Sequence, residues 1–270
     1  MHQKLKLPVI AILIIILLVI LATALGRGAQ PQDDVTNPTL EGVAYLRTLE
    51  EKDPTTVENT LKELRRRELL EQREARLAEL ESGDISIWSL FEDYMLMGDS
   101  RVMGFSFYEY LDQSRVLAEK GDTIWTLQEH IPEIVAVNPS YLFISYGVND
   151  VGSGMWASPE DYVQDFSDII SEIRQELPDV KIFINSILLA YAPAFNTSAA
   201  WYDIPEYNTA LDAMCSDMGC FYVDNTSICE EYAGLYESDG IHVGSSFYSH
   251  WATNMIMAIY DSETDQSELE

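Results

Sequence analysis

From Tyr94 onward, apolar strand-like runs alternate with amphipathic helical stretches, and this alternation limits the folds that the chain can adopt. Residues 161–173 show the clearest 3.6-residue period, which is typical of a helix with one buried face. The alternation predicts an α/β domain with a mostly parallel five-stranded sheet and helices on both faces. The expected strands are Tyr94–Met97, Arg115–Ala118, Tyr141–Ser145, Lys181–Ile187 and Phe221–Val223, and the expected helices are Thr126–Val137, Pro159–Leu177, Trp201–Met218 and Ser245–Tyr260.

Polar and glycine-containing segments follow the first three expected strands. In parallel sheets of this kind, ligands bind beyond the carboxyl ends of the strands. The segments are Gly98-Asp99-Ser100, Glu119 to Asp122, and Gly147 to Asp150, while Asp239-Gly240-Ile241-His242 precedes the last helix. We therefore expect these four segments to meet at one edge of the sheet.

Together the four segments contain the parts of a nucleophilic hydrolase. Serine is a weak nucleophile at neutral pH and needs a base beside it. His242 is the candidate base for Ser100, and Asp239 the candidate partner that orients the imidazole ring. The backbone N–H groups of Ser100 and Gly121 and the side-chain amide of Asn149 are candidate donors to an oxyanion.

Each residue also has a simpler interpretation when it is taken alone. Ser100 would more often be a helix N-cap, and Gly121 a turn residue. Asn149 suits a turn or a cap equally well. A metal site built on Asp239 and His242 would need further His or Cys ligands nearby, and the sequence offers none. The sequence predicts neither a metal nor another cofactor.

The four segments, in this order, resemble the sequence blocks of SGNH (GDSL-type) hydrolases. The likeness covers roughly residues 94–260. It implies a flavodoxin-like three-layer α/β/α sandwich and a serine esterase that needs no cofactor. It also implies that Ser100, Asp239 and His242 are catalytic, and that Gly121 and Asn149 contribute to the oxyanion hole. Members of the family act on acyl groups of lipids, sugars, thioesters and cell-wall polymers, so the resemblance leaves the substrate open.

The first third of the chain has a different composition. Val9–Leu25 carry no charge and follow Lys4 and Lys6, which predicts a signal peptide or, as we favour, an uncleaved signal anchor over residues 1–25. Residues 26–83 are expected to form a linker that contains a charged helix over about residues 54–82. The hydrolase domain would then span residues 84–262, followed by an acidic tail over 263–270. The catalytic domain is expected to be extracytoplasmic, or secreted if the segment is cleaved.

The predicted domain is strongly acidic. Residues 84–270 contain 5 Lys and Arg against 32 Asp and Glu, within a chain of formal net charge −29. Such a surface would repel nucleic acid, which we exclude as a partner, and favours a substrate that is neutral or cationic where it makes contact. We favour the simpler interpretation that the charge only keeps the protein soluble. The expected partners are a small-molecule or glycan ester and, through the N-terminal segment, a membrane. The oligomeric state and the pairing of Cys215, Cys220 and Cys229 stay open.

Aromatic loops after the third and fourth strands are candidate rims of a substrate pocket. Trp156, Tyr191 and Trp201 are the candidate substrate-binding residues in them. Either loop could instead only pack over the sheet. Arg101 could bind an anionic group, although we favour its pairing with a carboxylate.

These observations lead to the hypothesis of an exported, membrane-anchored serine esterase. It would hydrolyse acyl esters, with an O-acetyl group on a carbohydrate or cell-wall polymer as the favoured substrate. One alternative is an O-acyltransferase that uses the same triad. A second is a binding or scaffold module without catalysis.

Overall fold

A computed structural model describes residue 43 and residues 54–269 of the chain. The chain divides at Val57 and Glu58 into two units, and the second, Glu58–Glu270, contains the fold described below. The predicted signal segment at residues 1–25 lies outside the described residues. No helix within the described part of the chain combines the length and the apolar character that crossing a membrane requires.

Five parallel strands form one sheet, in the order β2-β1-β3-β4-β5. This confirms the predicted α/β fold with a five-stranded parallel sheet. The strands are β1 (Tyr94–Gly98), β2 (Val116–Ala118), β3 (Tyr141–Ser145), β4 (Lys181–Asn185) and β5 (Phe221–Val223). Each lies within two residues of its predicted bounds, and β4 ends earlier than the apolar run because Ser186 and Ile187 already belong to the loop beyond the sheet.

Alternate side chains of each strand enter two separate cores. Met95 and Met97 of β1 pack on one face of the sheet, whereas Tyr94 and Leu96 pack on the other. The same period of two holds along β3 and β4, because successive side chains of a strand point to opposite faces. Burial on both faces explains why the strands appear in the sequence as nearly continuous apolar runs.

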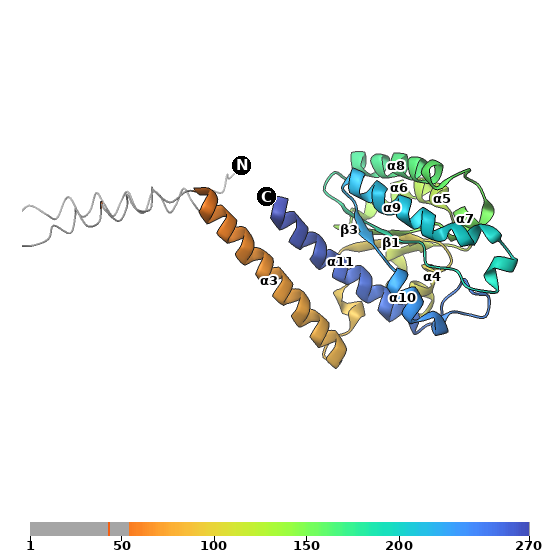
Figure 1. Cartoon of the computed structure of the whole chain (residues 1–270), viewed down its shortest axis with the longest axis horizontal. Coiled ribbons are helices and arrows are strands. Elements are labelled where there is room, and N and C mark those ends of the chain that lie inside the picture. The colour runs from red at the N-terminus through yellow and green to blue at the C-terminus, as the bar shows by residue number, and fades with distance from the viewer. Residues whose placement is uncertain (1–42, 44–53, 270) are drawn as a thin grey trace, which may run out of the picture. The chain divides into compact units, whose positions relative to one another are not determined.

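Helices cover both faces and give three layers (Figure 1). On one face lie α5 to α9, and on the other lie α4, α10 and α11. The bounds are α3 (Pro54–Ser82), α4 (Met103–Phe107), α5 (Ile124–Glu129), α6 (Ile131–Val137), α7 (Val148–Ser153), α8 (Pro159–Glu176), α9 (Ile204–Met218), α10 (Thr226–Glu231) and α11 (Phe247–Leu269), with short 3₁₀ helices at Ile87–Leu90, Gln113–Arg115, Ala194–Asn196, Ala199–Asp203 and Ala233–Leu235.

Two helices begin or break differently from the prediction. The expected helix Thr126–Val137 is two helices, α5 and α6, which meet at His130. Pro132 lies at the first turn of α6, where its missing N–H needs no partner, and a proline there favours a new start over a continuous helix. In the same way, Pro205 starts α9 at Ile204, and the preceding residues form a separate 3₁₀ turn.

The charged helix α3 contacts the catalytic domain through its second half. Arg73 Nε lies 2.7 Å from Asp261 Oδ1 of α11, and Leu77 and Leu80 pack against the core beneath α11. This helix therefore lies on the domain over these residues. Helix α11 itself continues to Leu269, so residues 263–269, expected to form a tail, extend the last helix.

A buried ion pair fixes the turn after β1. Asp99 is 0% and Arg101 is 1% exposed. Asp99 accepts hydrogen bonds from the backbone N–H and from the guanidinium of Arg101, whose Nη1 also donates to the carbonyl of Leu188 at 2.9 Å. The guanidinium is therefore enclosed, and Arg101 pairs with a carboxylate instead of presenting its charge to a substrate.

Replacing Arg101 by alanine should strongly destabilise the protein. Arg101→Ala is expected to lower the free energy of unfolding by about 3–5 kcal/mol, because Asp99 would remain buried without its partner. Urea unfolding measures the change. Arg73→Ala is the matched control, since its exposed pair with Asp261 should contribute only about 0–1 kcal/mol. Equal losses for the two variants would contradict the assignment.

Candidate active site

Three adjacent strands end level with one another and bring their following loops together. Gly98 of β1 pairs in register with Ala118 of β2 and with Ser145 of β3. Since β1 lies between β2 and β3, the segment with Ser100 is flanked by the loop after β2 and by the start of α7. The predicted meeting of these segments at one sheet edge is therefore present in the fold.

The serine turn has room for only a glycine at its first position. A Cβ atom on Gly98 would lie 2.2 Å from Cγ2 of Val102 and 2.6 Å from the carbonyl oxygen of Ser145. Helix α4 begins at Met103 with Val102 as its N-cap, so Ser100 does not cap it. The Ser100 hydroxyl instead lies 2.9 Å from Nε2 of His242.

Asp239 holds the imidazole ring of His242 from the other side. Its Oδ2 lies 2.6 Å from Nδ1 of His242, and its Oδ1 accepts the backbone N–H groups of Ile241 and His242. Burial alone would raise the pKa of the Asp239 carboxyl. The hydrogen bonds from the His242 ring and from these backbone groups outweigh burial, and the pKa is lowered below the ordinary value. Asp239 is therefore ionised at neutral pH and favours the ring tautomer that carries hydrogen on Nδ1.

The turn that carries Asp239 and His242 is held by the loop after β4. The backbone N–H of Tyr191 donates to the carbonyl of Gly240 at 2.9 Å. Gly240 has φ +74°, and a Cβ there would lie 2.1 Å from the carbonyl oxygen of Tyr191. The Tyr191 hydroxyl donates to the carbonyl of Cys229. This residue, predicted to bind substrate, therefore supports the turn that carries Asp239 and His242, and its hydroxyl bonds within the protein.

The predicted oxyanion-hole residues lie on the two loops that flank Ser100. Gly121 is exposed and has φ +92° in the turn after β2. Asn149 lies in the first turn of α7, and its side-chain amide donates to the carbonyl of Asp122 at 2.8 Å. One amide hydrogen of Asn149 thus joins the two loops, which leaves its second hydrogen for a ligand.

The two predicted tryptophans are packing residues in the structure. Trp156 is 9% exposed, and its Nε1 donates to Asp165 at 2.7 Å. Trp201 donates to the carbonyl of Val148 and packs on Gly152, so it fastens the loop after β4 to α7. Trp156 also supports a second aromatic ring, that of Trp125, which stacks on it.

Trp125 is the exposed aromatic residue that the sequence analysis missed. It is 41% exposed, at the second position of α5, and its ring stacks on Trp156 with a centroid distance of 6.0 Å and an interplanar angle of 20°. The neighbouring Ile124 N–H bonds to Asp150, next to Asn149. The only signal in the sequence was an aromatic residue in a helix that begins at the active edge of the sheet.

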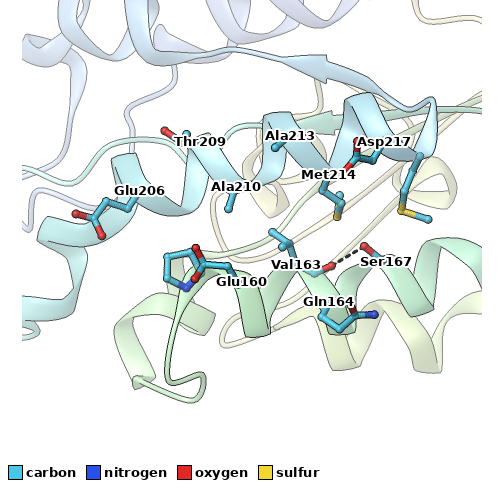
Figure 2. Close-up of a pocket in the computed structure, with 12 residues that line it drawn as sticks. Glu160, Val163, Gln164, Ser167, Glu206, Thr209, Ala210, Ala213, Met214 and Asp217 are labelled. Carbon is cyan, nitrogen blue, oxygen red and sulfur yellow. Dashed lines mark hydrogen bonds between the residues drawn. The ribbon is translucent and has the colours of Figure 1, made fainter.

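A pocket of about 790 Å³ lies elsewhere, between α8 and α9 (Figure 2). Small side chains of α9, Ala210 and Ala213, face Val163 of α8 across it, which leaves the space unfilled. None of the predicted site residues lines it. The chemistry expected here therefore belongs to the sheet edge and not to this pocket.

Metal and disulfide chemistry have no visible site in the described residues. Within residue 43 and residues 54–269, no three His, Cys, Asp or Glu side chains are grouped so that they could hold a metal ion. Cys215, Cys220 and Cys229 are buried and free, and burial raises the pKa of each thiol.

Several solved structures and curated sequences are similar to this chain. A GDSL-like lipase from Bacteroides thetaiotaomicron aligns with TM-score 0.50 and 15% identity over 62% of this chain and 87% of its own. The lipase/acylhydrolase from Enterococcus faecalis aligns with TM-score 0.50 and 15% identity over 63% and 96%. The N-acylneuraminate cytidylyltransferase of Streptococcus agalactiae is 24% identical over 175 residues, which are 64% of this chain but only 38% of that protein.

The family assignment comes from a match along the catalytic domain itself. The model of the GDSL-like lipase/acylhydrolase family matches residues 98–249. This range begins at the serine turn and includes Asn149, Asp239 and His242, and it covers more than half of the chain. The chain belongs to the GDSL-like lipase/acylhydrolase family and is an SGNH-type hydrolase.

Proposed function

We propose that Ser100 is the nucleophile of this hydrolase, with His242 as its base and Asp239 as the partner of the base. The observation that carries this proposal is the unbroken chain of contacts, 2.9 Å from Ser100 Oγ to His242 Nε2 and 2.6 Å from Nδ1 to Asp239. His242 removes the hydroxyl proton while Oγ attacks the ester carbonyl, and the protonated ring then gives that proton to the departing alcohol. Water, deprotonated by His242, cleaves the acyl-serine, releases the carboxylic acid and returns the proton to Ser100.

The oxyanion formed during each attack needs donors that are already in position. The backbone N–H groups of Ser100 and Gly121 and the free amide hydrogen of Asn149 are the proposed donors. Their loops follow three neighbouring strands, which supports this assignment. Losing one such donor typically costs about 3–4 kcal/mol of transition-state stabilisation.

The proposed substrate is a short acyl ester, most simply acetyl, on a carbohydrate or cell-wall polymer. The side chains of His242 and Asp239 are 42% and 50% exposed, so the triad is open enough for a bulky alcohol. Trp125 offers a flat apolar surface for a sugar ring beside the proposed oxyanion hole. The curated relatives are named for an N-acylneuraminate, a sugar acid, which agrees with a carbohydrate, but this chain spans only about two fifths of their length.

The proposed location is the outer face of a membrane. The uncharged run Val9–Leu25 after Lys4 and Lys6 supports an anchor with the lysines inside. The formal net charge of −29 supports a neutral ester as substrate and argues against a nucleic acid partner.

Ester hydrolysis by Ser100 is tested with p-nitrophenyl esters of increasing chain length. Wild type should cleave the acetate ester fastest, because we propose a short acyl group. Ser100→Ala and His242→Ala should each lose on the order of 10⁴-fold or more in kcat. A preference for long chains would overturn the proposed acyl group.

A second reading of the same experiment separates hydrolysis from transfer. With an added glycan acceptor, a hydrolase should release free acid at an unchanged rate. A transferase would instead transfer the acyl group to the glycan faster than to water. If wild type is as inactive as both variants and a fluorophosphonate does not label Ser100, the proposed nucleophile is wrong.

The role of Asp239 is tested by removing its charge alone. Asp239→Asn should lower kcat by about 10²–10⁴-fold, because the amide cannot stabilise the imidazolium and favours the wrong tautomer. The midpoint of thermal unfolding should change little, since the carboxylate is half exposed. Unchanged kcat in the well-folded variant would remove Asp239 from the triad.

The role of Trp125 is tested by comparing two substrates. Trp125→Ala should raise KM for an acetylated oligosaccharide about fivefold, the equivalent of roughly 1 kcal/mol of lost ring contact. KM for p-nitrophenyl acetate should stay within about twofold. Phe107→Ala is the matched control, because Phe107 is 71% exposed on α4, on the opposite face of the sheet. Equal effects of the two variants would contradict a sugar platform at Trp125.

A further inference from the structure

Two consecutive side chains of α7 bind the loop that contains the proposed oxyanion donor Gly121. Asn149 donates to the carbonyl of Asp122 at 2.8 Å, and the Asp150 carboxyl accepts the backbone N–H of Ile124 at 3.0 Å. The two bonds lie on either side of Thr123, so the loop cannot pivot about a single attachment. The distance between the two proposed donors, the backbone N–H of Gly121 and the amide of Asn149, therefore depends on Asp150 as well as on Asn149.

Asp150 is unusually placed for a carboxyl group. It is 0% exposed, and its Oδ1 accepts the backbone N–H of Ile124. Among the described residues, its Oδ2 has no hydrogen-bond partner, and neither do the buried hydroxyls of Tyr146 and Tyr162. Burial of this kind disfavours the ionised carboxylate, because it removes the charge from water.

We propose that Asp150 is a positioning residue of the oxyanion hole, which holds the Gly121–Ile124 loop against Asn149. This inference rests on the proposed function of Ser100, Gly121 and Asn149. Asp150 acts through the backbone of the loop and is not proposed to touch the substrate.

The charge on Asp150 should then matter for the rate. Burial, with a smaller contribution from the Asp99 charge, raises the pKa of Asp150 to about 7, although the backbone N–H groups of Ile124, Asp150 and Gly147 act in the opposite direction. The uncharged carboxyl still accepts from Ile124, whereas the ionised one adds a negative charge beside a developing oxyanion. The titratable groups around Asp150 are Asp99 after β1, Asp122 after β2, Tyr146 after β3, Tyr162 of α8 and Tyr207 of α9, with Arg101 already paired to Asp99.

Asp150→Asn and Asp150→Leu separate the two contributions of the side chain. The asparagine keeps an oxygen for Ile124 N–H and cannot ionise, while leucine has the same branched shape, is bulkier and has no acceptor. With p-nitrophenyl acetate near pH 6, Asp150→Leu should lose about 10²-fold in kcat with KM within threefold, because the oxyanion hole acts on the transition state. Asp150→Asn should recover most of that loss.

The pH profile provides a readout that a purely structural role would not change. Wild-type kcat should fall as the pH rises through about 7, and Asp150→Asn should lack this fall up to about pH 9. Asp122→Asn is the matched control, because it removes a neighbouring charge and leaves the backbone carbonyl that Asn149 binds. If Asp122→Asn abolishes the fall and Asp150→Asn retains it, the inference is wrong.

Stability gives a test that does not depend on catalysis. A folded-state pKa raised above the unfolded value means that the native protein binds the proton more tightly. Stability from this group is present below about pH 4 and is lost as the pH rises to about 7. Between pH 4 and 7 the free energy of unfolding in urea should fall more for wild type than for Asp150→Asn. If it changes equally in the two proteins, Asp150 is not a buried uncharged carboxyl.

The outcomes also distinguish failure of this inference from failure of the proposed function. If wild type hydrolyses the ester and Ser100→Ala does not, the proposed function holds, and an unchanged kcat in Asp150→Leu overturns only the role of Asp150. If Ser100→Ala is as active as wild type, the proposed function fails first. Should Asp150→Leu not fold, Asp150→Asn still decides through the pH profile and the unfolding curves.

Discussion

The level ending of β2, β1 and β3 is the constraint on which the rest of the site depends. Gly98, Ala118 and Ser145 lie in one register row, so the loops after three strands start from the same edge. Backbone hydrogen bonds between buried parallel strands fix this row, and buried strands cannot slip by one residue without turning their side chains to the wrong face. The serine turn therefore stands between two loops whose starting points are rigid, and only the chain beyond them needs further support.

That further support comes from hydrogen bonds and a buried ion pair between neighbouring segments. Tyr191 holds Gly240 by a backbone hydrogen bond, and Trp201 fastens the same loop to α7. The buried pair of Asp99 and Arg101 fixes the turn beside Ser100, the proposed nucleophile. The parts of the site thus come from distant positions in the chain, with Ser100 and His242 separated by 142 positions, yet each rests on a neighbour that is itself packed.

Much of the fold could be predicted from the sequence, and the residues proposed as catalytic could be named from it, because both rest on local patterns. Apolar runs of strand length predicted the five strands of the sheet, and β3 and β5 have the predicted bounds. The contact of Ser100 with His242 agrees with the motif order, although the sequence contained no distance. What could not be predicted is the direction in which a side chain points and the neighbour that it contacts. Trp125 and Trp156 are the same residue type in the sequence, but in the structure the exposed ring of Trp125 stacks on the buried ring of Trp156. Arg101 follows the serine directly, but its side chain turns back to Asp99.

The attachment of α3 also determines which changes in chain length the molecule can accept. Arg73, Leu77 and Leu80 are spaced four and three residues apart, so they share one side of the helix that faces α11 and the core beneath it. Deleting a single residue between Arg73 and Leu80 would rotate one contact by about 100° relative to the other. Insertions or deletions are therefore expected to be rare in this seven-residue interval among relatives that keep the helix docked, whatever the length of the chain that precedes it.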